Sequence, residues 1–283
     1  MRKPFPPKSS RPFAKSGSGR PFPPRDRSDP KPVPASLKGD RPKALSHVPD
    51  PTNDVIYGIH AVAAVLANPQ RKIKKLWATE NGLQRLKEEG VSHSISPEIV
   101  HPRILDHLLT GQDAVHQGVV AEALPLKQPR LDQVPRDGLI VLLDQVTDPH
   151  NVGAILRSCA AFGVKALVTT ARHAPNETGV FFKAASGAYE HVPVSRVTNL
   201  SAAMEELRGY GFRLVGLDSE APITLEQASR ARPLALVLGS EGKGLREKTR
   251  ATCDEVARLD MPGAIKSLNV SIAAAISLYA LTH

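Results

Sequence analysis

Apolar and polar positions alternate in blocks along residues 137–283, and the blocks predict strands and helices in turn. Residues 139–143 form an uninterrupted apolar run, as in a strand buried on both faces. Further strands are predicted at 164–169, 192–194, 212–217, 234–238 and 256–259, and helices at 153–162, 178–185, 201–208, 245–252 and 268–281. This alternation predicts an α/β domain with a mostly parallel sheet and helices on both faces.

A smaller α/β module is predicted at residues 52–124. Its helices are expected at 61–67, 83–89 and 104–109, and its strands at 73–78 and 116–121. No pattern in it is typical of a reaction centre. Prolines and polar residues interrupt residues 125–136, which we interpret as a linker to the larger domain at 137–283.

Positive charge and proline are concentrated in residues 1–50, which hold 12 prolines and 12 Lys and Arg against 4 Asp and Glu. Because prolines at this density interrupt helices and sheets, we predict a disordered basic tail. Three repeats place a cation beside an aromatic ring: Lys3-Pro4-Phe5, Arg11-Pro12-Phe13 and Arg20-Pro21-Phe22. Two interpretations of the tail stay open, an RNA contact and a solubilising extension.

Several other classes of protein fit the sequence poorly. The longest apolar run, residues 272–281, is too short to span a bilayer, and no secretory segment follows Met1. The prolines also oppose the amphipathic helix of a mitochondrial transit peptide. Cys159 and Cys253 form no CxxC pair, and the histidines are not spaced as metal ligands. We therefore expect a cytoplasmic protein without a metal, a disulfide or a membrane segment.

In open α/β sheets, ligands bind at the carboxyl ends of strands, and three segments there carry polar residues and glycines. The first is residues 144–153, in which Asn151 could cap the next helix and Arg157 could reach back over the loop. Taken alone, Arg157 is better explained as a solvated surface residue than as a functional one.

The second segment is Gly239-Ser240-Glu241-Gly242-Lys243-Gly244, directly after a predicted buried strand. Three glycines allow a ligand to approach the backbone closely, and Glu241 adds a carboxylate. The order of glycines is neither that of a phosphate loop nor that of a dinucleotide fingerprint.

The third segment is residues 259–271, a strand end that turns into the last helix. Ser267 and Asn269 fall where helix caps are found, so their side chains could serve that helix alone.

In this order the three segments resemble one family. Asn-x-Gly-x-x-x-Arg at 151–157, Gly-Ser-Glu-Gly-x-Gly-Leu at 239–245 and Met-x-Gly-x-x-x-Ser-Leu-Asn-Val-Ser at 261–271 form the motif set of the SpoU/TrmH branch of the SPOUT RNA methyltransferases. Tyr57-Gly58-Ile59-His60 and His116-Gln117-Gly118 resemble the RNA-binding domain that precedes the catalytic domain in ribosomal RNA members.

The resemblance implies a SPOUT-type sheet with a C-terminal trefoil knot, which is an exception to unknotted topology. It also implies an S-adenosylmethionine pocket at the knot and a homodimer that reads structured RNA. The expected product is a ribose 2′-O-methyl group, with a guanosine of large-subunit ribosomal RNA favoured over transfer RNA.

The resemblance assigns roles residue by residue. Cofactor binding is carried over to Gly239, Leu259 and Leu268, largely through backbone contacts, with Leu217, Gly242 and Met261 as further candidates. Catalytic or substrate-orienting roles are carried over to Asn151, Arg157, Glu241, Ser267 and Asn269. Asp260 departs from the family, which usually has proline there.

A ribose 2′-hydroxyl is a poor nucleophile, so the reaction requires proton removal or stabilisation of a developing alkoxide. Arg157 is the candidate for that charge, and because a guanidinium hardly ever loses its proton we favour electrostatic stabilisation. Asn151 and Glu241 could orient Arg157 or the ribose, and Ser267 and Asn269 could hold the hydroxyl or a loop.

The last predicted helix is apolar nearly all round, so most of its surface must be buried. Burial within one subunit and burial in a dimer interface both explain this pattern. Two rival functions remain, a non-catalytic RNA-binding protein on the same fold and a dinucleotide-dependent enzyme. The intact motifs disfavour the first, and the glycine order disfavours the second.

Overall fold

The computed structural model describes residues 48–91, 95–109 and 114–283. The tail predicted at residues 1–50 lies outside the described residues, apart from 48–50. Two sheets organise the described chain, one in residues 54–123 and one in residues 139–258. No described helix has the length and apolar character needed to cross a bilayer.

The first sheet has four strands in the order β1-β4-β2-β3. Its strands are β1 (Asp54–Tyr57), β2 (Ile73–Ala78), β3 (Glu98–Ile99) and β4 (Val119–Ala123), and its helices are α1 (Ile59–Ala67), α2 (Glu80–Glu88) and α3 (Pro102–Leu108). β4 pairs antiparallel with β1 and β2, whereas β3 joins β2 in parallel. Helix α2 starts three residues before the predicted Leu83, because the Thr79 hydroxyl accepts a hydrogen bond from the Gly82 amide at 3.0 Å and caps it.

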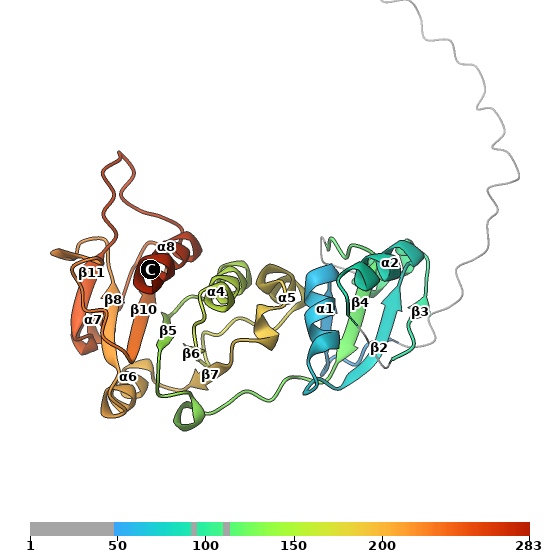
Figure 1. Cartoon of the computed structure of the whole chain (residues 1–283), viewed down its shortest axis with the longest axis horizontal. Helices are drawn as coiled ribbons and strands as arrows, with labels where there is room; N and C mark the ends of the chain where they lie inside the picture. The colour runs from blue at the N-terminus through green and yellow to red at the C-terminus, as the bar shows by residue number, and fades with distance from the viewer. Residues whose placement is uncertain (1–47, 92–94, 110–113) are drawn as a thin grey trace, which may run out of the picture. The chain divides into compact units, whose positions relative to one another are not determined.

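The second sheet has seven strands in the order β7-β6-β5-β10-β8-β11-β9, and every neighbouring pair is parallel (Figure 1). Its strands are β5 (Leu139–Asp144), β6 (Ala166–Thr170), β7 (Val194–Val197), β8 (Arg213–Leu217), β9 (Ile223–Thr224), β10 (Leu234–Gly239) and β11 (Glu255–Arg258). Its helices are α4 (Pro149–Ala161), α5 (Gly179–Ala185), α6 (Leu200–Gly209), α7 (Glu247–Thr252) and α8 (Val270–Thr282). The predicted α/β alternation is confirmed.

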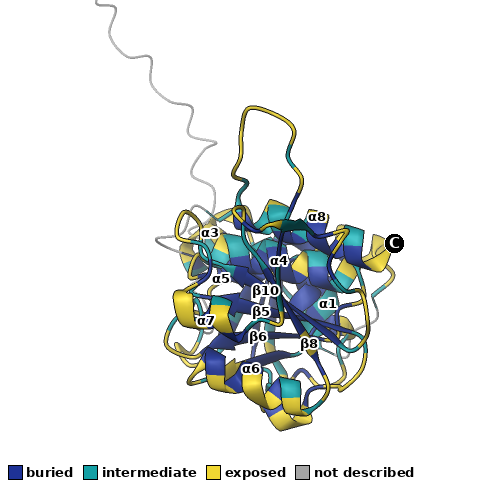
Figure 2. Cartoon of the chain, turned by 90° about the vertical axis from the view of Figure 1, so that its left-hand side faces the viewer, coloured by how far each residue is buried: buried dark blue, intermediate teal, exposed yellow. Residues whose placement is uncertain are grey.

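Both faces of this sheet are covered. Along β5, Leu139, Val141 and Leu143 pack into the core that includes α4, α5 and α8. Ile140 and Leu142 point the other way, into a core that includes α6. Figure 2 shows the buried strands between α4 and α8 on one side and α6 on the other. The apolar run at 139–143 is therefore a doubly covered strand.

Helix α4 corrects the sequence prediction at its N-terminus. We expected the helix to begin at Gly153 with Asn151 as its cap, but it begins at Pro149. Asp148 is the cap, because its carboxylate accepts a hydrogen bond from the His150 amide at 3.0 Å. Proline suits the first helical position, where no amide hydrogen is needed. Asn151 therefore lies in the first turn, and its side chain is free for another role.

The predicted linker is partly packed. It contains a short 3₁₀ helix, η2 (Leu131–Gln133), and Leu131 and Val134 are buried in the same core as α6. These two apolar side chains hold the segment against the second sheet.

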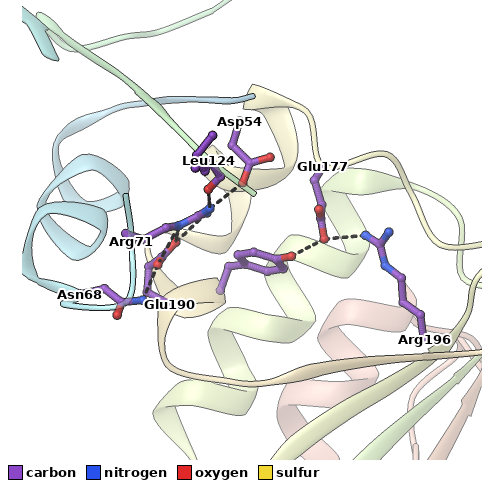
Figure 3. Close-up of polar contacts among 8 residues, drawn as sticks. Asp54, Asn68, Arg71, Leu124, Glu177, Glu190 and Arg196 are labelled. Carbon is purple, nitrogen blue, oxygen red and sulfur yellow. Dashed lines mark hydrogen bonds and ion pairs between the residues drawn. The ribbon is translucent and has the colours of Figure 1, made fainter. Parts of the chain in front are cut away.

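A buried arginine joins residues from the two regions that contain the sheets (Figure 3). Arg71 lies just before β2, and its side chain is fully buried. It donates to the Asp54 carboxylate and to the Leu124 carbonyl, each at 2.7 Å, and to Glu190 at 3.0 Å. Glu190 ends the 3₁₀ helix η3 (Ala188–Glu190), which follows α5, and it also accepts from Asn68 at 2.7 Å. One cation thus neutralises a carboxylate from each sheet region.

This arrangement makes Arg71 a stability determinant. Burial raises the pKa of Asp54, while the Arg71 guanidinium opposes that rise. Without the cation, two buried carboxylates would face each other with no compensating charge.

We expect Arg71→Met to lower the free energy of unfolding by about 3–5 kcal/mol, because removing one partner strands the other buried charges. Urea denaturation followed by circular dichroism measures the change. Arg103→Met is the matched control, since Arg103 is an exposed arginine of α3, and it should change stability by less than about 0.5 kcal/mol. Equal effects of the two substitutions would contradict the assigned role of Arg71.

Candidate active site

A cavity of about 310 Å³ lies at the carboxyl ends of β8, β10 and β11, which are neighbours in the sheet. Its volume is within the range of small-molecule sites. Eight of the residues singled out from sequence line it: Leu217, Gly239, Glu241, Gly242, Leu259, Met261, Ser267 and Leu268. Asn151, Arg157 and Asn269 are not among its lining residues.

The glycine segment after β10 closes on itself. The Ser240 amide donates to the Gly244 carbonyl at 3.1 Å, and the Gly244 amide donates back to Ser240 at 2.9 Å. A Cβ atom on Gly239 would meet the Gly244 carbonyl carbon at 2.1 Å, so no other residue fits there without movement of the backbone. Gly242 at the tip has a φ of 79°, which favours glycine. The group that closely approaches the backbone of Gly239 is thus the Gly244 backbone of the same segment.

The loop between β11 and α8 stands out from the sheet and is largely exposed (Figures 1 and 2). Lys266 ties its two arms together by donating to the Met261 carbonyl at 2.5 Å. Ser267 lies on this loop, exposed and at the wall of the cavity. Ser267 therefore does not cap α8, and its hydroxyl is available to a ligand.

Asn269 does cap α8, and it also reaches the first motif. Its side-chain oxygen accepts from the Ser271 amide at 2.9 Å and from the Ser271 hydroxyl at 2.6 Å. Its Nδ2 donates to Oδ1 of Asn151 at 3.0 Å. Residues 118 positions apart in sequence are thereby joined, and the bond fixes the first motif beside the third.

Arg157 is not brought to the cavity within one chain. It is exposed on α4, and it has no hydrogen bond or ion pair with any other residue that the structure describes. Its guanidinium is therefore a charge without a partner among the residues that the structure describes.

Sequence reasoning missed part of the wall. Asp218, Ser219 and Glu220 follow β8 directly and line the cavity. The rule that ligands collect at strand ends could have found them, because Leu217 is the last residue of the predicted strand. Asp218 is held in an ion pair with Arg250.

An ion pair between Asp144 and Arg246, which sequence reasoning also missed, connects two of the motif loops. Asp144 ends β5 with a fully buried side chain, and Arg246 follows the glycine segment. Nε of Arg246 donates to Asp144 at 2.6 Å, and the Arg246 amide donates to it at 3.0 Å. The pair fastens the start of the first loop to the end of the second. The two residues are 102 positions apart in sequence, so no local pattern predicts the pair.

Neither cysteine offers a nucleophile. Burial is the main cause that raises the pKa of Cys253 to about 12, and burial also raises the pKa of the Cys159 thiol. Both thiols stay protonated near neutral pH. In the described ranges, no cluster of three or more His, Cys, Asp or Glu side chains could hold a metal ion.

Comparison with known proteins settles the family. The SpoU rRNA methylase family model matches residues 138–279. The chain belongs to the SpoU rRNA methylase family. A model for RNA 2′-O ribose methyltransferase substrate binding matches residues 55–129 of this SpoU protein.

The alignments with named relatives span nearly the whole length of those relatives. The chain is 39% identical over 235 residues to a 23S rRNA (guanosine-2′-O-)-methyltransferase RlmB from Pseudomonas aeruginosa, covering 79% of this chain and 94% of the relative. It is 37% identical over 242 residues to RlmB from Haemophilus influenzae, covering 82% of this chain and 98% of the relative.

Solved structures share the fold. The SpoU methyltransferase AviRb from Streptomyces viridochromogenes, in complex with AdoMet, aligns with a TM-score of 0.67 at 24% identity, covering 82% of this chain and 89% of that one. An AdoMet-bound rRNA methyltransferase from Sinorhizobium meliloti aligns with a TM-score of 0.67 at 22% identity, over 81% and 87% of the two chains.

SpoU methyltransferases use S-adenosylmethionine, and the cavity fits this molecule. Leu217, Leu259 and Leu268 line the wall with apolar surface that would suit an adenine ring. Glu220 places an exposed carboxylate at the wall that would suit the hydroxyl groups and positive charges of the cofactor, whereas the carboxylate of Asp218 is already paired with Arg250. The closed glycine segment adds backbone groups at the same wall.

Gly239→Ala should weaken S-adenosylmethionine binding at least about tenfold, or about 1.4 kcal/mol, because the new methyl group must push the Gly244 backbone out of place. Isothermal titration calorimetry measures the affinity. Gly209→Ala is the control, since a Cβ there meets nothing within 4 Å and the affinity should be unchanged. A Gly239→Ala protein that binds like Gly209→Ala would show that the segment does not shape the cofactor site.

Proposed function

We propose that this chain transfers a methyl group from S-adenosylmethionine to the ribose 2′-hydroxyl of a guanosine in large-subunit ribosomal RNA. The cavity where the second and third motifs meet carries this proposal, because it joins a fitting cofactor wall to exposed polar side chains. The RlmB relatives support the choice of substrate, since the alignment spans both the substrate-binding and the methylase regions.

When bound, S-adenosylmethionine supplies an electrophilic methyl group. The chain's own residues have to orient the ribose and lower the energy of the oxygen that attacks. Arg157 supplies positive charge for the developing alkoxide, in the electrostatic role that suits a guanidinium, since guanidinium groups hardly ever lose their proton in proteins. Glu241 and Ser267 are exposed at the cavity wall, where they can contact the ribose hydroxyls. Asn269 and Asn151 position one another through their hydrogen bond.

The proposal includes a homodimer in which Arg157 acts at the partner's cavity. Within one subunit Arg157 does not line the cavity, so its charge has to come from a second copy. An apolar surface suited to that contact lies on the third motif and on α8, which follows it. Seven large hydrophobic residues are exposed in the described chain, and four fall between 265 and 279: Ile265, Ile272, Ile276 and Tyr279. Such clustering is typical of an interface.

The remaining parts of the organisation are proposed with it. The basic tail at 1–50, the RNA-binding module at 52–124, the linker at 125–136 and the catalytic domain at 137–283 form its domains. The family models at 55–129 and 138–279 support the two folded regions. A C-terminal trefoil knot and a cytoplasmic location, where ribosomal RNA is found, complete the proposal.

Arg157→Ala should lower the rate of methyl transfer at least about 100-fold while S-adenosylmethionine affinity stays near that of the wild type, because the guanidinium acts on the alkoxide. Incorporation of labelled methyl groups into ribosomal RNA from cells lacking the gene measures the rate, and calorimetry measures the affinity. Arg157→Lys keeps a charge and should retain more activity than Arg157→Ala. Equal loss of binding and turnover would make Arg157 a structural residue.

Co-expression of Arg157→Ala with Gly239→Ala subunits tests the dimer. If Arg157 serves the partner's cavity, each mixed dimer has one complete site, and random assortment restores about a quarter of wild-type activity. Leu268→Arg serves as a second cavity variant if Gly239→Ala folds poorly. Monomers in size-exclusion chromatography, or a mixture as inactive as its parts, would refute action across the dimer.

A further inference from the structure

A second cavity lies at the same edge of the seven-stranded sheet. It has a volume of about 300 Å³ and is bounded by Arg172 after β6, by Thr198 and Asn199 after β7, and by Arg246 and Lys248 near the start of α7. Since all strands of this sheet are parallel, the cavity opens on the edge that carries the cofactor cavity. We call it the basic cavity.

Its charge is strongly one-sided. Three of its lining residues are cations, Arg172, Arg246 and Lys248, and the lining recorded for it in the described chain includes no Asp or Glu. Arg172 and Lys248 are exposed, and neither side chain has a hydrogen bond or ion pair with the rest of the described structure. Unpaired cations that converge on one concavity attract an anion.

Arg246 is held in place for such a role. Its Nε donates to the buried Asp144 carboxylate at 2.6 Å, which fixes the plane of the guanidinium. Both terminal nitrogens have no hydrogen-bond or ion-pair partner among the described residues, and the side chain is 44% exposed. A guanidinium anchored at one nitrogen and open at two others can bind a phosphate with little loss of side-chain entropy.

The first turn of α6 contributes partial positive charge. Asn199 caps this ten-residue helix by accepting from the Ala202 amide at 3.2 Å. The amides of Leu200 and Ser201, both at the cavity, precede any possible partner within the helix. Amides at a helix start favour anions, and here they add to three side-chain cations.

The lining also says which anion fits. A nucleobase binds best on a broad aromatic platform, and among the described residues the basic cavity is lined by no Phe, Tyr or Trp and by a single imidazole, that of His173. A phosphodiester requires charge and hydrogen-bond donors alone. We propose that the basic cavity binds a backbone phosphate of the substrate RNA, and so sets the register of the chain at the cofactor cavity. This deepens the proposed function and rests on it for the identity of the RNA.

Arg172→Ala and Lys248→Ala test the proposal. Each should make the negative slope of log affinity against log salt concentration less steep by about 0.7–0.9, the value for one lost phosphate contact. Filter binding of total ribosomal RNA from cells lacking the gene, over a series of KCl concentrations, measures the slope. KM for RNA should rise several-fold with kcat and S-adenosylmethionine affinity retained.

Lys165→Ala is the matched control. Lys165 precedes β6 whereas Arg172 follows it, so the two exposed cations flank one strand at opposite edges of the sheet. Loss of Lys165 removes the same charge and should leave the slope unchanged. Equal slopes in the three variants would overturn the proposal, because overall charge would then explain the binding.

Two further outcomes separate the possible errors. If the wild-type protein transfers no methyl group but the slopes change as expected, the proposed function fails and the RNA contact stands. If inorganic phosphate raises the melting temperature of the wild type but not of Arg172→Ala, while RNA binding is the same in both, the cavity holds a free anion and the proposal is wrong.

Discussion

The parallel pairing of β10, β8 and β11 is the constraint on which the site depends. Loops that leave three parallel neighbours must emerge at one edge, so segments far apart in sequence become adjacent walls. The same rule places the loops after β5, β6 and β7 at that edge, where the basic cavity lies. The Asp144–Arg246 pair stands between the two cavities, because Arg246 lines one of them and follows the loop of the other. The order of strands therefore decides which loops, and which of their polar side chains, line the same cavity.

Local contacts then fix the loops with few ion pairs. The glycine segment is held by two backbone hydrogen bonds and by the contact that Gly239 permits, and the first and third motifs are joined by the Asn151–Asn269 bond. Neutral contacts of this kind leave the charged side chains of the site uncommitted. Glu241 and Arg157 have no hydrogen bond or ion pair with other residues of the described chain, which suits groups that act on a bound molecule. Arg71 has a structural role instead, since its charge is neutralised in the interior by ion pairs with Asp54 and Glu190.

Most of the second sheet could be predicted because its strands are buried on both faces and read as plain apolar runs, as residues 139–143 do. Strands β1, β3 and β9 were missed; β3 and β9 have two residues each, and pairing with neighbours rather than local pattern defines them. The predicted start of α4 is wrong because Asp148, rather than Asn151, caps the helix, and Asn151 lies in its first turn. Of the site, the glycine segment and the third motif were visible in sequence. The Asp144–Arg246 pair and the distance of Arg157 from the cavity depend on tertiary structure, which no local spacing encodes.

Two features of the described chain have no explanation in the contacts of its described residues. Arg157 carries a motif position and yet lies outside the cavity, and α8 buries one face while Ile272, Ile276 and Tyr279 remain exposed on it. A surface arginine alone would account for the first feature and leave the second, since exposed apolar side chains in one stretch lower solubility without benefit. The proposed second subunit, packed on α8, would account for both, because α8 packs on α4, the helix that carries Arg157. The apolar contact would then supply the binding energy, and the position of Arg157 beside it would turn assembly into a condition for catalysis.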